Sequence, residues 1–239
     1  MNELSLFSGA GGGLLASRWL LGWHTICAVE IDEYCRRVLM QRQDEGYLEP
    51  FPIWNDVRTF DGRPWRGLVD VVTAGFPCQP YSTASRGRRV VEDLFGEVER
   101  IVAEVQPRWL FCENVLASAY PEQCRRSLLK CCPAGLGAPH HRERQWLVAY
   151  ADDAEQPEFT VDAEVARVSA VGEAVWDEAA LGRVLGMDDG LALRMVRLRA
   201  LGNGQVPLVA ARAWDLLMGR ITEEGDDGRR ERARARVAV

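Results

Sequence analysis

One short stretch of the chain fixes a single thiol between two prolines. "GFPCQPYS", residues 75–82, follows the apolar run "VDVVTA", so Cys78 comes just after the end of an expected strand. Proline fixes its own φ and restricts the residue before it, so the backbone is stiff on both sides of the sulfur. Such a segment either shapes an ordinary loop or presents a nucleophile on a defined trajectory. Taken alone, the pattern favours the ordinary loop, and the rest of the chain has to decide.

A glycine-rich turn near the N-terminus predicts a nucleoside site. "SGAGGG" (8–13) follows the apolar run "ELSLF" (3–7), and such a turn lets the backbone approach a ligand at a helix N-terminus. The next run, "HTICAVE" (24–30), ends in Glu30, which can accept hydrogen bonds from two ribose hydroxyls. The turn departs from G-x-G-x-x-G and no P-loop lysine follows, which favours S-adenosylmethionine over a pyrophosphate cofactor. Two alternatives stay open: the glycines serve packing only, and Asp56 in "NDV" is a turn residue rather than a ligand of the adenine amino group.

The hydrophobic pattern alternates between strands and helices along most of the chain. This alternation predicts an α/β fold, a doubly wound, mostly parallel sheet with helices on both faces. Short apolar runs predict strands at 3–7, 24–30, 68–75, 108–114 and 144–150. Helical spacing predicts helices at 14–21, 32–43, 92–105 and 207–219, the last with proline in its first turn.

Composition excludes several classes of protein. A chain of 239 residues, 47% of them hydrophobic, can bury one larger domain, or a domain with a small lobe. It has no apolar run of about 18 residues and no secretory signal, and its seven cysteines lack CxxC spacing, so we expect a reduced, cytoplasmic protein without a metal site. The net charge of −6 counts against nucleic-acid binding, but its distribution matters more than its sum. Arginines cluster at 86–89, 142–144, 194–199 and 229–236.

Seven short motifs follow one another along the chain: "LFSGAGGG" (6–13), "VEID" (29–32), "NDV" (55–57), "GFPCQPYS" (75–82), "ENV" (113–115), "GAPHHRER" (137–144) and "LGNGQVP" (201–207). In this order they resemble the motifs of the C5-cytosine DNA methyltransferase family. They cover most of the chain apart from about 151–190 and the C-terminal tail. The resemblance implies a Rossmann-like methyltransferase sheet, S-adenosylmethionine as cofactor and double-stranded DNA as substrate.

The resemblance also implies a role for individual residues. Cys78 would add to C6 of a flipped cytosine, and Glu113, with a raised pKa, would protonate N3, while Arg142 and Arg144 hold the O2 side of the base. The base that removes the C5 proton is not assigned. The expected cofactor-binding residues are Phe7, Ser8, Gly9, Gly11, Glu30, Ile31, Asp56, Val57, Pro77, Leu94 and Asn203. The expected DNA contacts, on a mobile loop after Cys78, are Gln79, Ser82 and Arg86.

The chain departs from the family in the region that would read the DNA sequence. We expect a catalytic domain at 1–150, a reduced target-recognition region at 151–193, a returning segment at 194–220 and a disordered Arg-rich tail at 221–239. The recognition region is acidic and offers few side chains for base edges. This predicts a compact, monomeric enzyme with a short recognition sequence, or one that relies on a specificity partner. A stand-alone or phage-type modification enzyme fits such a small recognition region best.

Two other functions remain open at this point. The first is a tRNA cytosine-C5 methyltransferase of the same family, whose motifs around Cys78 would look nearly the same. The second is a degenerate, non-catalytic nucleic-acid-binding subunit. The family's usual glutamine is His140 here, a donor or acceptor that can preserve the orienting hydrogen bond. Its usual serine is Gly204, which removes one expected cofactor contact.

Overall fold

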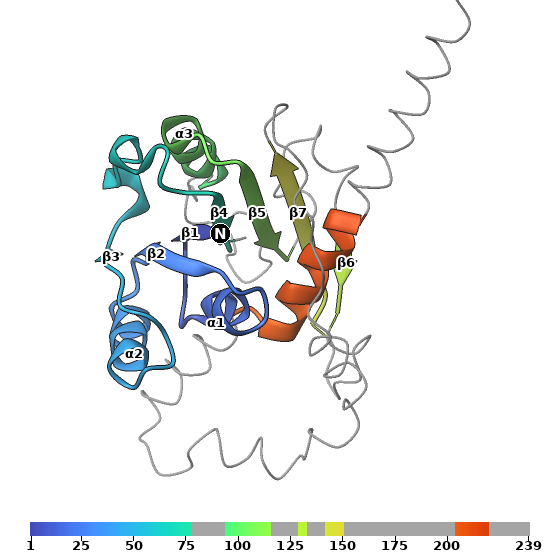
Figure 1. Ribbon diagram of the computed structural model, residues 1–239, viewed down its shortest axis with the longest axis horizontal. Coiled ribbons are helices and arrows are strands. Elements are labelled where there is room, and N and C mark those ends of the chain that lie inside the picture. Colours follow the sequence, from blue (N-terminus) through green and yellow to red (C-terminus); the bar gives the residue numbers. More distant parts are fainter. Residues whose placement is uncertain (78–93, 116–128, 133–141, 151–203, 220–239) are drawn as a thin grey trace, which may run out of the picture.

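The computed structural model describes residues 1–77, 94–115, 129–132, 142–150 and 204–219. Its centre is a seven-stranded sheet in the order β3-β2-β1-β4-β5-β7-β6 (Figure 1). The strands are β1 (Asn2–Leu6), β2 (His24–Val29), β3 (Ile53–Trp54), β4 (Val71–Ala74), β5 (Trp109–Asn114), β6 (Leu129–Cys131) and β7 (Arg144–Tyr150). The helices are α1 (Gly12–Trp19), α2 (Glu33–Asp44) and α3 (Phe95–Val105), with 3-10 turns η1 (Val57–Thr59) and η2 (Arg63–Trp65) and a further α-helix at 207–219.

The strand directions confirm the predicted doubly wound α/β sheet. β1 pairs in parallel with β2 and β4, and β4 pairs in parallel with β5, whereas β7 runs antiparallel to both β5 and β6. The strand order reverses between β1 and β4. In open α/β sheets, ligands bind outside the carboxyl ends of the strands at such a switch point. The topology therefore places the expected site where β1, β2, β4 and β5 end.

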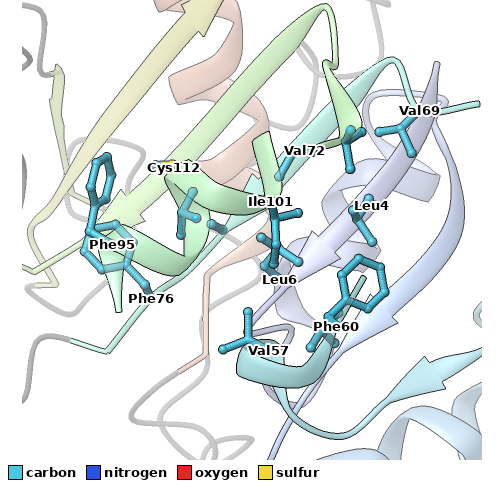
Figure 2. Packing of buried hydrophobic residues seen from close by; sticks show 14 of the residues in the cluster. Leu4, Leu6, Val57, Phe60, Val69, Val72, Phe76, Phe95, Ile101 and Cys112 are labelled. Carbon is cyan, nitrogen blue, oxygen red and sulfur yellow. The ribbon is translucent and has the colours of Figure 1, made fainter. Parts of the chain in front are cut away.

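One face of the sheet is covered by α3. Leu4 and Leu6 of β1 point to this face because side chains alternate along a strand. They pack with Ile101 (Figure 2) and with Val98, and the helical spacing of α3 places both on its buried side. Phe76, at the end of β4, stacks edge-to-face on Phe95. The residues just before Cys78 are therefore anchored in the hydrophobic core.

The other face is covered by α1 and the helix at 207–219. Trp214 of that helix lies fully buried against Trp109 of β5 and Trp23. Glu3, the one charged residue of β1, points to the same face. Its carboxylate accepts hydrogen bonds from the hydroxyls of Ser17, Thr25 and Thr73 at 2.7–2.9 Å. Burial raises the pKa of Glu3 above its ordinary value, and these three bonds oppose the shift.

The expected target-recognition region and the Arg-rich tail lie outside the described residues, so the domain boundaries stay predictions. In the described part of the chain, every helix is too short or too polar to cross a membrane.

Candidate active site

The glycine-rich turn after β1 has a backbone that few residue types adopt. Phe7, Gly9 and Gly11 have φ values of 55°, 55° and 91°. For Phe7 this left-handed conformation is strained, and such strain persists where the surrounding structure demands it. Ser8 fixes the turn, because its amide donates to Val29 O at 3.2 Å and its hydroxyl bonds Ser5. Space above Gly9 is open: a Cβ there would meet no atom within 4 Å.

Glu30 ties this turn to the end of β2. One carboxylate oxygen accepts from the Gly9 amide at 2.7 Å, and the other accepts from the Asp32 amide at 2.8 Å. Burial raises the pKa of Glu30, and the two backbone bonds lower it. Each carboxylate oxygen has a second lone pair, so both can still accept from a ribose hydroxyl. Beside it Ile31 is 62% exposed, an apolar surface fit to cover a flat ring. These residues fit a nucleoside cofactor.

Most of the remaining described residues of the expected cofactor site have contacts or burial that leave less of the side chain for a ligand. Asp56 caps η1 and accepts from the Arg58 guanidinium, whose Nη2 lies 2.7 Å from Oδ2. The adenine amino group would therefore share Asp56 with Arg58. The Val57 side chain is buried in the core, so only its backbone can meet a ligand. Leu94 is half-buried at the start of α3, and Pro77 is exposed at the end of β4.

The buried Glu113 forms an ion pair with the partly buried Arg144 at the carboxyl end of β5. The antiparallel register, in which Asn114 faces Gln145, brings the start of β7 beside this end. Arg144 Nε lies 2.7 Å from Glu113 Oε1, with the side chains 15% and 8% exposed. Burial raises the pKa of Glu113, while Arg144, Arg142 and a hydrogen bond from Gln205 oppose the shift. A carboxyl under these opposing influences can exchange a proton with a bound base.

Two contacts that the sequence did not predict hold this arrangement together. The buried Asn114 amide donates to Phe76 O at 2.9 Å, which fixes the chain two residues before Cys78. Arg142 donates through Nη2 to Gly204 O, and burial followed by the nearby Arg144 charge lowers the pKa of Arg142. The sequence offers only a weak signal for Asn114, which lies inside the "ENV" motif, and none for what Gly204 would contact.

The structure thus brings Glu30, Glu113, Arg142 and Arg144 to one edge of the sheet, together with the glycine-rich turn. Several predicted residues lie outside the described part of the chain and keep their predicted roles: Cys78, Gln79, Ser82, Arg86 and Asn203.

The sheet order and its antiparallel β7 define a Rossmann-like methyltransferase fold. Two solved structures share this fold. A DNA modification methyltransferase encoded within an Escherichia coli prophage is 24% identical, with 69% of this chain and 50% of that chain covered and a TM-score of 0.50. The Dnmt2 methyltransferase of S. pombe is 18% identical, with 81% and 63% covered and a TM-score of 0.51.

Sequence comparison then identifies the family. The model of the C-5 cytosine-specific DNA methylases matches residues 1–130, more than half of this chain, and the chain belongs to that family. It is 36% identical over 116 residues to the type II methyltransferase M.Eco47II of Escherichia coli, covering 47% of this chain and 26% of the relative. It is 30% identical over 178 residues to M.CviJI of Paramecium bursaria Chlorella virus IL3A, covering 66% and 45%. The chain thus matches less than half the length of these curated relatives.

Proposed function

We propose that this chain is a DNA (cytosine-5-)-methyltransferase that attacks a flipped cytosine through Cys78. The observation that carries the proposal is the ion pair of the buried Glu113 with Arg144 at the end of β5, beside the strand end that leads into Cys78. Membership of the methylase family supports the same reaction. Double-stranded DNA would be the substrate. The enzyme would recognise it alone or together with a specificity partner, and would act in the cytoplasm.

Cytosine C5 is a weak nucleophile, so the protein has to change the ring before alkylation. The Cys78 thiolate would add to C6, forming an S–C bond and turning C5 into the nucleophilic end of an enamine. Glu113 would donate a proton to N3 and so neutralise the charge that this addition places on the ring. Arg142 and Arg144 would hold the base at O2. C5 would then take the methyl group that the cofactor supplies, with the donor S–CH3 bond breaking as the C5–CH3 bond forms. A base would remove the C5 proton, the thiolate would leave as the C5–C6 double bond forms again, and N3 would return its proton to Glu113.

S-adenosylmethionine, when bound, supplies a methyl group on an electrophilic sulfonium. Glu30 would hold its ribose and the backbone turn at 8–11 would approach it, because the Glu30 oxygens keep acceptor capacity and space above Gly9 is open. Ile31 and Asp56 would border the adenine. These residues would orient the cofactor relative to the target base.

A covalent trap tests this proposal. A pool of duplexes of randomised sequence carries 5-fluorocytosine in one strand, since fluorine at C5 cannot leave as a proton and blocks release of the thiol. With S-adenosylmethionine present, the wild-type chain should form a complex that survives denaturing electrophoresis, and Cys78→Ser should not.

Cys27→Ser is the matched control for the trap. Burial raises the pKa of the Cys27 thiol to about 12, so it is not a nucleophile, and this variant should still form the complex. An RNA pool of the same design separates the two nucleic acids. A complex with RNA alone would indicate the tRNA enzyme. A folded chain that binds the cofactor and traps neither pool would be the non-catalytic subunit.

A further inference from the structure

The Gln205 side chain fills the space between the glycine-rich turn and Glu113. A Cβ built on Gly13 would lie 2.5 Å from Gln205 Oε1, and one on Gly75 would lie 3.0 Å from Nε2 and 3.5 Å from Glu113 Oε2. The two ends of the amide therefore face different parts of the site. The oxygen faces the first turn of α1, and the nitrogen faces the end of β4 and Glu113.

The backbone of the same residue is packed as closely. A Cβ on Gly12 would lie 2.1 Å from the carbonyl oxygen of Gln205, far inside van der Waals contact. Glycine at 12, 13 and 75 thus leaves room for Gln205. The packing explanation applies to Gly12 and Gly13, which face Gln205, while Gly9 faces open space and stays a predicted cofactor contact.

Three described side chains from two segments of the chain act on the Glu113 carboxyl. Arg144 reaches it from β7, and Arg142 acts from the residues just before that strand. Gln205 hydrogen-bonds it from the segment leading into the helix at 207–219. Gln205 is the one uncharged donor of the three, so its contribution does not titrate. Arg142 also donates to Gly204 O, which ties the two segments to each other.

We propose that Gln205 is a positioning residue for Glu113, whose amide links the cofactor turn to the carboxyl that acts on the target base. The proposal rests on the proposed function and adds a residue to it. Because the amide nitrogen donates to the carboxyl while the amide oxygen faces α1, the orientation of Glu113 depends on where the turn at 8–13 lies. A turn ordered by the cofactor then also orders the acid that protonates N3.

This arrangement predicts how the protonation of Glu113 responds to Gln205. Donation from an amide stabilises the ionised carboxylate, so it lowers the pKa of Glu113 against the raising effect of burial. Gln205→Met keeps the length of the side chain and removes the donor. The pKa of Glu113 should then rise further, and the carboxyl should lose one of its fixed contacts.

The experiment titrates Glu113 directly and measures the reaction in parallel. Protein with 13C-labelled glutamate carboxyls is titrated by NMR, with Glu113→Gln used to assign the signal. Single-turnover methyl transfer is then measured against pH. For Gln205→Met we expect a higher Glu113 pKa, a rate about ten- to a hundredfold lower, and an alkaline limb of the rate profile displaced to higher pH.

Gln41→Met is the matched control, because the Gln41 amide also donates to a carboxylate, that of Glu45 at 2.7 Å, at the exposed C-terminal end of α2. It should change neither the Glu113 titration nor the rate. Gln205→Asn, whose shorter amide cannot reach Glu113, should raise the pKa as well and carries the test if the methionine variant does not fold. An unchanged Glu113 titration, or a rate loss equal at every pH, overturns the proposal. Failure of the proposed function would give a different result. The wild type would transfer no methyl group, while the titration would still show whether Gln205 changes the pKa of Glu113.

Discussion

Replacing Gly12 by alanine puts a methyl group where the carbonyl oxygen of Gln205 lies. The built Cβ is 2.1 Å from that oxygen and 3.1 Å from its carbon, whereas ordinary contact begins at 3.4 Å. The segment at 204–206 would have to withdraw by roughly 1 Å to relieve the overlap. A displacement of this size, carried to Glu113 through the Gln205 amide, predicts a rate about a hundredfold lower.

The same overlap should also cost stability. Overpacking costs about 1–3 kcal/mol, while alanine in place of a helical glycine returns about 0.5–1 kcal/mol. Gly12→Ala should therefore unfold at a temperature a few degrees lower, at about 2–4 °C per kcal/mol for a chain of this size. Thermal unfolding and single-turnover methyl transfer measure the two effects separately.

Gly96→Ala provides the matched control for this substitution. Gly96 also lies in the first turn of a helix, α3, but a Cβ there would meet no atom within 4 Å. This variant should be as active as the wild type and slightly more stable, by about 0.5–1 kcal/mol. If Gly12→Ala keeps the wild-type rate and stability, segment 204–206 does not pack on α1 as described, and the link to Glu113 fails with it.

Three further predictions concern residues at the edge of the sheet and beneath it. Glu30→Gln replaces one acceptor oxygen by an NH2 donor that would face the Gly9 amide, which is also a donor. Calorimetry should therefore show a cofactor affinity at least about tenfold weaker. An unchanged affinity would mean that Glu30 does not bind the cofactor. Asn114→Ala removes the bond to Phe76 O and should lower the single-turnover rate about tenfold while cofactor affinity stays the same. Burial raises the folded-state pKa of Glu3, so the folded chain holds this proton more tightly than the unfolded chain, and stability falls as pH rises from 4.5 through the folded pKa. Urea unfolding at about pH 5 and about pH 8 should show that Glu3→Gln lessens this loss; an equal loss in both proteins would contradict it.

The elements that the sequence predicts best are those in which the apolar pattern extends over many residues. The helix predicted at 207–219 has these bounds in the structure, and the strand predicted at 144–150 is β7. β3 and β6 were missed, since strands of two and three residues are too short to show alternation. The strand predicted from 68 begins only at Val71, because the chain is still in a turn there, with Gly67 at a φ of 77°. The antiparallel direction of β7 leaves no periodic signal at all.

The residues of the candidate site also differ in how far the sequence predicts them. Glu30 could be predicted because it is an acid at the end of an apolar run, whereas Glu113 was predicted from the resemblance of "ENV" to a family motif. The two lie at one edge of the sheet because the carboxyl ends of parallel strands meet there. Gln205 and Asn114 could not be predicted, because each acts through a partner 38 or more residues away in the chain. Glu3 was missed because its three hydroxyl partners come from three different elements, and only the folded sheet brings them together.

Transfer of a labelled methyl group from S-adenosylmethionine to unmethylated duplex DNA, followed by base-resolution mapping, tests the central claim most directly. We expect label at C5 of cytosine in a short or degenerate sequence context, and none with Cys78→Ser. Label at another atom or base, or a folded chain that binds the cofactor and labels no DNA, would contradict the assignment.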